Sequence, residues 1–302
     1  MTASSAKTKR QFLHPETISR IENLNLIARL VVEGFIIGLH KSPFHGFSVE
    51  FAEHRQYMPG DEIKHIDWKL YGKTDRYYVK QFEEETNLKA YIVLDASKSM
   101  AFSSNGVSKL QYGSYLGAAF TYLMLKQQDA VGLTVFDDGI RTMVPPSSRP
   151  SYLNVILGQM EQLQPGAETD IASTLHELAD RIKKRGLIIL ISDLLDNPDQ
   201  VIAGLKHFRH RKHEVLVFHI MDLQEVRFNY HRQVKFTDME SGTHLTTEPR
   251  LIQNAYQKEV RRFLRHYRQE CLSNHIDYIH LTTDQPFDLA LTEYLNKRQR
   301  LG

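Results

Sequence analysis

Five short runs of almost uninterrupted apolar residues constrain the fold of this chain more than any other feature. They are AYIVLD from residue 90, AVGLTVF from 130, GLIILIS from 186, EVLVFHIMD from 214 and IDYIHLTT from 276. A strand that is apolar along its whole length is typical of a parallel sheet covered by helices on both faces. Stretches with helical patterning separate the runs, at about 109–126, 151–163, 171–184, 199–210 and 250–273. This alternation predicts an α/β fold with a doubly wound, mostly parallel sheet.

Smaller elements complete the predicted domain. A hairpin strand is expected near 141–144, bounded by Pro145 and Pro146, and a β-hairpin turning at Ser241-Gly242 is expected within 224–247. A terminal helix should follow the last strand. The apolar runs begin at about residue 88, so we assign residues 88–302 to the α/β domain.

The first 87 residues follow other patterns. A polar tail is followed by a helix that begins near Pro15 and runs to about Gly38, since proline is accepted in a first helical turn. The segment between this helix and the α/β domain is dense in aromatic and charged residues. Two stretches of it, around 47–57 and 77–82, have the pattern of short strands. We therefore expect a tail and amphipathic helix over 1–40 and a small β-rich segment over 41–87.

The helix near residues 24–39 is the segment most similar to a membrane span. Charged or polar residues recur every three or four positions along it, including Arg29 and Glu33, so they lie on one helix face. The run is also shorter than the roughly 20 apolar residues that a span requires. No signal-peptide core is present at the N-terminus, and Cys271 is the single cysteine, which excludes an intrachain disulfide. We expect no membrane span and a cytoplasmic location.

The charge of the chain gives little support to a nucleic-acid partner. Lysine and arginine number 38 against 36 acidic residues, so the formal net charge is only +2. One face of the helix near 250–273 is basic, through Lys258, Arg261, Arg265 and Arg268. A charged helix face without interleaved aromatic residues is more typical of a solvated surface than of a nucleic-acid site. We do not expect nucleic-acid binding.

Oxygen-bearing side chains follow two of the predicted strands. Asp95, Ser97 and Ser99 come directly after the first strand, and Asp193 follows the strand that ends at Ile191. Ligands of doubly wound sheets bind beyond the carboxyl ends of the strands, near the point where the strand order reverses. Carboxylate and hydroxyl oxygens are the ligands of hard cations such as Mg²⁺. These residues predict a divalent-cation site.

A third segment, Gly166-Ala-Glu-Thr169-Asp170, precedes a predicted helix and supplies another hydroxyl. Serine, threonine and aspartate are also the preferred residues at helix N-caps, so each loop has a purely structural interpretation. The alternate spacing of Asp95, Ser97 and Ser99, and the presence of all three segments in one chain, favour the cation site.

The set Asp95-x-Ser97-x-Ser99 with Thr169 and Asp193 resembles the metal-ion-dependent adhesion site of von Willebrand factor A domains. The resemblance covers residues 88–302. It implies a von Willebrand A-like fold in which Ser97, Ser99 and Thr169 bind the metal directly or nearly so, while Asp95 and Asp193 act largely through water. Either member of the Thr169-Asp170 pair could point towards the metal.

The preceding segment carries a second resemblance. Its motifs are His45-Gly46-Phe47, Glu53-x-Arg55-x-Tyr57, Pro59-Gly60-Asp61, Ile66-Asp67-Trp68, Tyr71, Lys73-Thr74, Lys80 and Glu83-Glu84-Glu85-Thr86. They are similar to those of the bacterial family catalogued as domain of unknown function 58, in which such a block precedes a von Willebrand A-like domain. Members are often encoded near MoxR-type AAA+ ATPases. The resemblance therefore implies an adaptor or chaperone-like partner of such an ATPase or of its client.

Enzyme motifs are incomplete. A P-loop ending at Gly72-Lys73-Thr74 would need glycine where Asp67 stands, and the zincin-like His176-Glu177 is followed by Asp180 in place of a second histidine. We therefore predict a non-enzymatic interaction module that docks an acidic partner residue through Mg²⁺, Mn²⁺ or Ca²⁺. Two alternatives remain: a hydrolase that uses the same cation as a Lewis acid, and a metal-free scaffold.

Overall fold

The computed structural model describes residues 14–40, 54–57, 71–72, 75, 77–80, 88–166, 170–230, 234–237 and 244–301. Contacts between Cα atoms divide the chain into two units. The larger unit contains the described residues up to Ile37 together with those from Leu88 onward, and the smaller unit is Gly38–Asn87.

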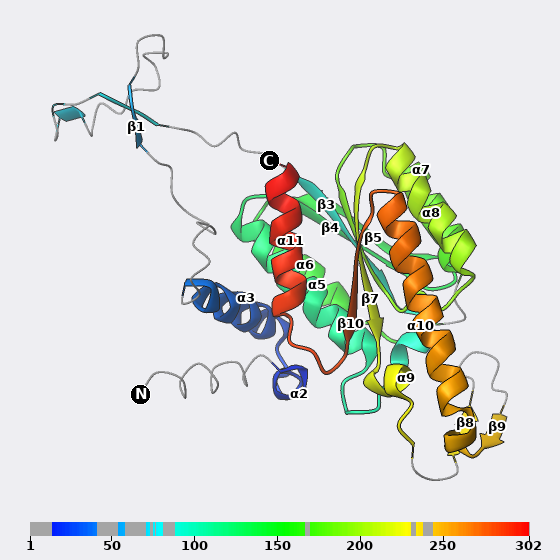
Figure 1. Ribbon diagram of the computed structural model, residues 1–302. Helices are drawn as coiled ribbons and strands as arrows, with labels where there is room; N and C mark the ends of the chain where they lie inside the picture. The colour runs from blue at the N-terminus through cyan, green and yellow to red at the C-terminus, as the bar shows by residue number, and fades with distance from the viewer. Residues whose placement is uncertain are drawn as a thin grey trace. The chain divides into compact units, whose positions relative to one another are not determined.

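A six-stranded sheet forms the centre of the larger unit (Figure 1). Its strands are β3 (Lys89–Asp95), β4 (Ala130–Phe136), β5 (Ile140–Ser147), β6 (Leu187–Ser192), β7 (Glu214–Met221) and β10 (Asp277–Thr282). They lie in the order β10-β7-β6-β3-β4-β5, and every pairing except β4 with β5 is parallel. All five apolar runs form strands, and the predicted doubly wound, mostly parallel α/β fold is confirmed. The strand order reverses between β3 and β6.

The edge strand β5 corrects one prediction. It runs from Ile140 to Ser147 and so continues through Pro145 and Pro146, which were expected to end it. Proline is accepted in an edge strand because its missing N–H can face away from the ladder. The facing strand is irregular at Gly132, where an added Cβ would lie 2.7 Å from the carbonyl oxygen of Val144. Glycine at this position lets the proline-containing strand approach closely.

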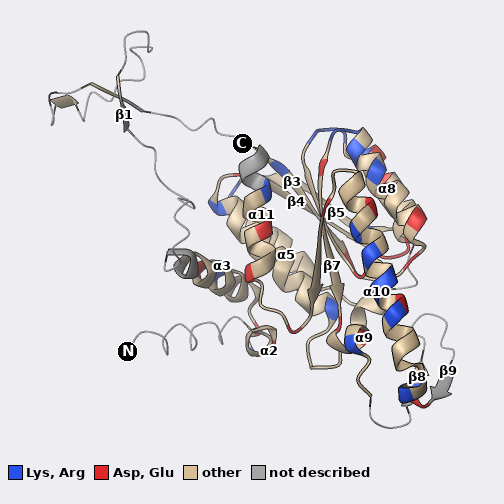
Figure 2. Cartoon of the chain, viewed as in Figure 1, with Lys and Arg blue, Asp and Glu red and all other residues tan. Residues whose placement is uncertain are grey.

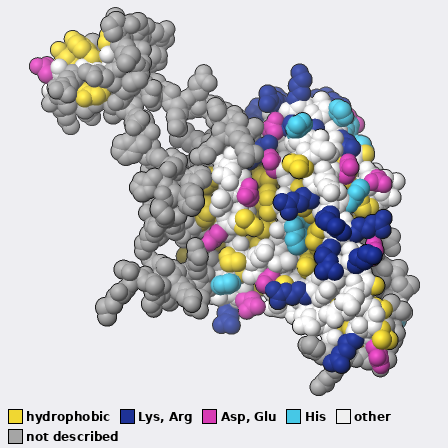
Figure 3. Space-filling view, viewed as in Figure 1, with side chains coloured by type: hydrophobic (Ala, Val, Ile, Leu, Met, Phe, Trp, Pro, Cys, Tyr) yellow, Lys and Arg dark blue, Asp and Glu magenta, His cyan; other side chains and the backbone are white. Residues whose placement is uncertain are grey.

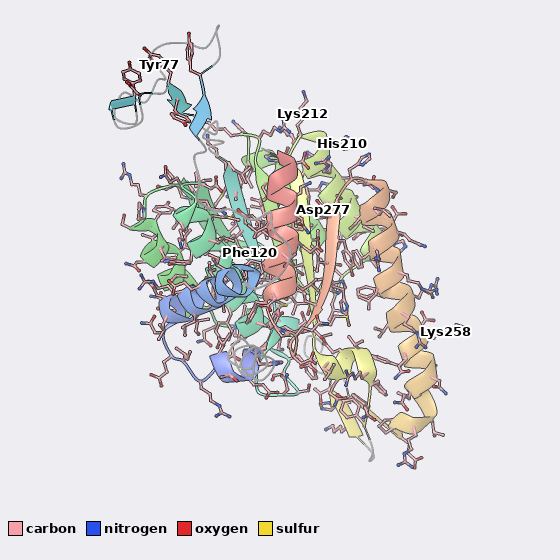
Figure 4. All side chains as sticks on the ribbon, turned by 60° about the vertical axis from the view of Figure 1, so that its left-hand side comes forward. Tyr77, Phe120, His210, Lys212, Lys258 and Asp277 are labelled. Carbon is pink, nitrogen blue, oxygen red and sulfur yellow. The ribbon has the colours of Figure 1, made fainter. Side chains whose placement is uncertain are left out.

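Helices cover both faces of the sheet. One face packs against α7 (Ile171–Arg181), α8 (Pro198–His210) and α10 (Pro249–Ser273), and the other against α5 (Lys109–Lys126), α6 (Tyr152–Glu161) and α11 (Asp288–Leu301). On the second face, Phe120 of α5 stacks on Phe218 of β7 at 5.1 Å and contacts Tyr294 of α11 at 5.3 Å (Figure 4). Strand side chains are therefore buried on both sides, as the apolar runs require.

The N-terminal helices belong to this unit. The single helix expected from Pro15 to about Gly38 is two helices in the structure, α2 (Pro15–Ile18) and α3 (Leu24–His40). One apolar side of α3, which includes Ile27 and Val32, is buried, while Leu26 and Leu30 are exposed. The side chains of Asn25 and Asn154 of α6 are hydrogen-bonded at 3.2 Å, and Tyr122 of α5 donates to Glu33 at 3.3 Å. Within the described part of the chain, no helix is long and apolar enough to cross a membrane.

Between β7 and α10 lie a short helix, α9 (Leu223–Arg227), and a two-stranded hairpin of β8 (Val234–Thr237) and β9 (His244–Thr247). The hairpin was expected from the sequence, but its turn at Ser241-Gly242 lies outside the described residues. α9 was not expected. Its N-cap is Asp222, which accepts a hydrogen bond from the backbone N–H of Gln224.

In the smaller unit, β1 (His54–Gln56) pairs antiparallel with β2 (Tyr78–Lys80), and Tyr71 stacks on Tyr77 at 4.5 Å. Tyr77 is labelled in Figure 4. Most residues of the motifs in this segment, including Trp68, lie outside the described residues.

Candidate metal site

The carboxyl ends of β3 and β6 place Asp95 and Ser192 side by side. Asp95 is fully buried, and its Oδ2 accepts a hydrogen bond from the Ser192 hydroxyl at 2.6 Å. Its Oδ1 accepts from the backbone N–H of Ser97 at 2.8 Å, which fixes the loop that follows β3. The site therefore begins at the point where the strand order reverses, as predicted for a ligand site of a doubly wound sheet.

Two hydroxyl groups meet beside this carboxylate. Ser97 caps the short 3₁₀ helix η2 (Lys98–Ala101), and the Oγ atoms of Ser97 and Ser99 lie 3.1 Å apart, both buried. Adjacent oxygen ligands of an octahedral Mg²⁺, each about 2.1 Å from the metal, are about 3 Å apart. The spacing of the hydroxyl pair therefore fits two neighbouring positions of such a shell.

Asp193, the second predicted carboxylate, forms an ion pair inside the protein. Its Oδ2 lies 2.7 Å from the ammonium Nζ of Lys109, and the same Nζ lies 2.7 Å from Oε1 of Glu225. The Lys109 side chain has no exposed surface. The other oxygen of Asp193 accepts from the backbone N–H of Leu195 at 3.3 Å.

Burial and neighbouring charges shift the pKa of Asp95, Lys109 and Glu225. Burial and the negative charge of Asp193 together raise the pKa of Asp95 to about 7, against the lowering effect of the hydrogen bonds from Ser192 and Ser97. Burial lowers the pKa of Lys109, but Asp193 and Glu225 outweigh it and the net shift is upward. Burial raises the pKa of Glu225 in spite of its ammonium partner. We take Lys109 as charged, because two carboxylates contact it.

Thr169, the third predicted hydroxyl ligand, lies outside the described residues. Residues on either side of it are hydrogen-bonded to the loops that follow β3 and β6. Gly166 N–H donates to the carbonyl oxygen of Ala96 at 2.7 Å, and the N–H of Ile171 donates to Asp196 at 3.1 Å. Asp170 caps α7 by accepting from the N–H of Ser173 at 2.9 Å.

A chain of hydrogen bonds connects the Asp95 carboxylate, through Ser192 and Leu194, to α10. The Ser192 hydroxyl accepts from the N–H of Leu194 at 2.9 Å, and Leu194 has a left-handed backbone conformation with φ of 52°. The hydroxyl of Tyr267, on α10, donates to the carbonyl oxygen of Leu194 at 3.1 Å. A buried polar network of this kind fixes the direction of each group.

Sequence reasoning missed Lys109, Glu225 and Asp137. Lys109 could have been found, because it falls on the inward stripe of its helix with Tyr112, Leu116 and Phe120. The buried Asp137 follows β4 and lies 3.5 Å from Arg141. No comparable pattern in the sequence indicates Glu225, which belongs to the short α9.

The donor set partly fits a hard cation. Among the described residues, no group of three or more His, Cys, Asp or Glu side chains is arranged to hold a metal. A site with two carboxylates and several hydroxyls does not need one, and the Ser97–Ser99 spacing fits Mg²⁺. A cation bound here would share the Asp193 carboxylate with the ammonium group of Lys109.

The chain is similar to several proteins whose structures are solved. They include the conserved hypothetical protein BatB from Bacteroides thetaiotaomicron, with a TM-score of 0.49 and 17% identity over 70% of this chain and 99% of that one. An aerotolerance-related membrane protein from Bacteroides fragilis gives 0.48 and 18% over the same shares, and the SpRpn10 VWA domain gives 0.39 and 10% over 68% and 94%.

Relatives by sequence cover almost the whole chain. Uncharacterized proteins of Mycobacterium tuberculosis and Mycobacterium bovis are each 25% identical over 297 residues, which is 95% of this chain and 91% of the relative. The profile of one family, described as protein of unknown function DUF58, matches residues 53–265. That match spans most of the small unit and, in the larger unit, the strands β3 to β9 and α10 up to residue 265. The chain therefore belongs to the DUF58 family.

Proposed function

We propose that this protein is an interaction module that binds a divalent cation, foremost Mg²⁺, and through it an acidic residue of a partner protein. Ser97, Ser99 and Thr169 would hold the cation, with Asp95 and Asp193 acting largely through water. The cation would supply a coordination position that a partner carboxylate oxygen can fill. The observation that carries the proposal is the 3.1 Å approach of two buried serine hydroxyls beside the Asp95 carboxylate.

The charge of the cluster supports this function. With all groups ionised, the carboxylates of Asp95, Asp193 and Glu225 and the ammonium of Lys109 sum to a charge of about −2. A divalent cation neutralises that charge, and a nearby positive charge favours the ionised form of Asp95. Hydroxyls and water then fill the remaining coordination positions without charge, so a partner carboxylate can displace water without meeting a net negative site.

The partner that the family resemblance suggests is a MoxR-type AAA+ ATPase or a client of that ATPase. Metal and partner should each strengthen the binding of the other, because linkage between two ligands is reciprocal. Co-purification with the ATPase in Mg²⁺, and its loss in EDTA, would support this assignment.

One observation favours a rival function, a metal-free scaffold. The Lys109 ammonium already neutralises Asp193, so the loops after β3 and β6 can be held together by an internal cation alone. The two functions differ in one measurable property, the response of the protein to divalent cations.

Thermal unfolding in EDTA and then in Mg²⁺, Mn²⁺ or Ca²⁺ tests the proposal. A cation at a hundred times its dissociation constant should stabilise the wild type by about 2.7 kcal/mol. Ser99→Ala and Asp95→Asn should remove this stabilisation, because each loses an oxygen of the site. Ser151→Ala is the matched control, since the exposed Ser151 makes no side-chain cap hydrogen bond. Identical unfolding of the wild type with and without cations would contradict the proposal and favour the scaffold.

A further inference from the structure

A pocket lined mainly by aromatic side chains opens beside the serine pair. Its volume is about 410 Å³, and Ser99, Leu195 and Glu225 form the part of its lining next to the candidate metal site. Another part of the lining, here called the aromatic wall, consists of Phe228, Tyr230, Phe236 and Tyr256. Pockets of about 300–1,000 Å³ with apolar walls and a few polar groups are the usual sites for ligands.

The aromatic wall is built as a stacked cluster from three segments. Phe228, at the end of α9, stacks on Tyr256 of α10 at 4.2 Å and on Phe236 of β8 at 5.3 Å. Tyr230 meets Phe228 and Phe236 edge-on at 5.3 and 5.4 Å. Such contacts fix the rings relative to one another, so the wall is preformed.

The backbone of Phe228 is held in an uncommon conformation to build this wall. Its φ of 49° lies in the left-handed region, which a bulky residue adopts only when its surroundings impose it. Its N–H donates to the carbonyl oxygen of Gln224 at 2.8 Å, and its own carbonyl accepts from Gln253 at 3.1 Å. Residues held in this way concentrate at functional sites.

The described lining of the pocket contains one carboxylate, and the helix that contributes Tyr256 to its wall is rich in basic residues. Among the described residues that line it, Glu225 is the one carboxylate, and it is paired with Lys109 at 2.7 Å. α10, which contributes Tyr256, carries six Lys or Arg and two Glu, and basic side chains gather along it (Figures 2 and 3). Lys258, two positions after Tyr256, points away from the helix into solvent (Figure 4).

We propose that this pocket binds a large apolar side chain of the partner, on the residue directly before or after the acidic residue that the cation binds. The inference rests on the proposed function and defines its ligand as a peptide in which Asp or Glu stands next to Trp, Phe, Tyr, Leu or Met. Ser99 belongs both to the metal site and to the pocket, so neighbouring residues of one peptide can reach both. Leu195, 41% exposed on the same rim, adds apolar surface for that residue.

Labelled peptides test the inference directly. The probes are Gly-Gly-Asp-X-Gly and Gly-X-Asp-Gly-Gly, with X as Trp, Phe, Leu or Ala, and fluorescence anisotropy measures their dissociation constants in Mg²⁺ and in EDTA. We expect Trp and Phe peptides to bind the wild-type protein at least tenfold more tightly than Ala peptides. Tyr256→Ala and Phe236→Ala should reduce this preference to less than threefold, because each removes one ring of the wall.

Two controls separate the pocket from the fold. Tyr256→Phe keeps the ring and should keep the preference, and Tyr152→Ala removes a ring from α6, outside the pocket lining, and should leave it unchanged. Replacing Asp by Asn in the peptides tests the proposed function separately, since it removes the carboxylate and keeps X.

The outcomes distinguish the two proposals. Binding that requires Asp and Mg²⁺ but ignores X would overturn the pocket inference and leave the proposed function standing. A preference for aromatic X that needs neither Asp nor Mg²⁺ would overturn the proposed function and the link between pocket and metal. Absence of binding by every peptide would overturn the inference. A dimer that Tyr256→Ala dissociates would also overturn it, because a second copy of the chain would then occupy the pocket.

Discussion

Lys109 is the residue that most changes the interpretation of the site. A lysine with no exposed side-chain surface is rare, and this one is stabilised by two carboxylates, Asp193 and Glu225. Breaking a buried ion pair costs more than the pair contributes, because the remaining charges stay buried. Lys109 is therefore both a structural group and a neighbour of the candidate metal ligands.

Lys109→Met should lower the free energy of unfolding by about 3–5 kcal/mol, because it leaves Asp193 and Glu225 without their cation. Urea unfolding in EDTA at pH 7.5 measures the loss. Lys126→Met, at an exposed position of the same helix, is the control and should change stability by less than about 0.5 kcal/mol. A loss below about 1 kcal/mol for Lys109→Met would show that the pair does not stabilise the fold.

His219 should make the protein sensitive to acid. Burial, followed by the nearby His280, lowers the pKa of His219 to about 3. In the unfolded state His219 has an ordinary pKa near 6.5, so the unfolded state binds the proton first as pH falls. The stability that neutral His219 contributes is therefore fully present above about pH 6.5 and is lost as pH falls towards 3. At pH 5 the loss should be about 2 kcal/mol.

The comparison that isolates His219 is the wild type against His219→Phe, each unfolded in urea at pH 7.5 and pH 5. Asp95 titrates with the opposite sign, since a raised pKa in the folded state makes the fold less stable as pH rises from about 4 to about 7. The difference between the two proteins cancels that effect. If His219→Phe loses as much stability at pH 5 as the wild type, the predicted role of His219 is wrong.

At the scale of elements, the apolar runs predicted the sheet because its strands are buried on both faces. Nearly every position of such a strand is therefore occupied by an apolar residue. The strand order then brings Asp95, Ser97, Ser99 and Asp193 to one edge of the sheet, which their positions after two strands had indicated. The partners of these side chains were harder to predict. Glu225 belongs to a five-residue helix with too few positions for a periodic signal.

The pairing of β4 with β5 depends on Gly132. Gly132→Ala would place its Cβ 2.7 Å from the carbonyl oxygen of Val144 and 3.0 Å from the nitrogen of Pro146, and backbone atoms cannot move aside as side chains can. We expect a loss of about 1–3 kcal/mol in urea unfolding, as for other overpacked sites.

Gly139→Ala is the control for this prediction, because nothing lies within 4 Å of its added Cβ. It should change stability by less than about 0.5 kcal/mol. Equal effects of the two substitutions would mean that the close approach at Gly132 does not limit the pairing of the strands.

At the scale of the whole molecule, the chain leaves its larger unit at Ile37, near the end of α3, and returns to it at Leu88. α3 packs with α5 and α6 through contacts such as Asn25 to Asn154, so it should unfold together with the sheet. Ile27→Ala should destabilise the entire unit by about 2–5 kcal/mol, because Ile27 is only 1% exposed.

Urea unfolding followed by circular dichroism checks this prediction, with Leu30→Ala, at a position 43% exposed, as the control that should cost less than about 1 kcal/mol. A separate early transition for Ile27→Ala would instead show that α3 is an independent element. The sequence predicted the amphipathic character of this helix but not its partner, since an apolar stripe does not specify the surface that covers it.

The place of α3 has a consequence for synthesis of the chain on the ribosome. α5 begins at Lys109, so about 70 more residues must be made after α3 ends at His40, which takes roughly 3 to 14 seconds at ordinary translation rates. During that interval the apolar stripe around Ile27 and Val32 lacks the helices that later bury it. The nascent chain therefore exposes an apolar segment early, at the stage when ribosome-associated chaperones act. Synonymous codons that slow translation between α3 and α5 would lengthen that exposure without altering the finished protein.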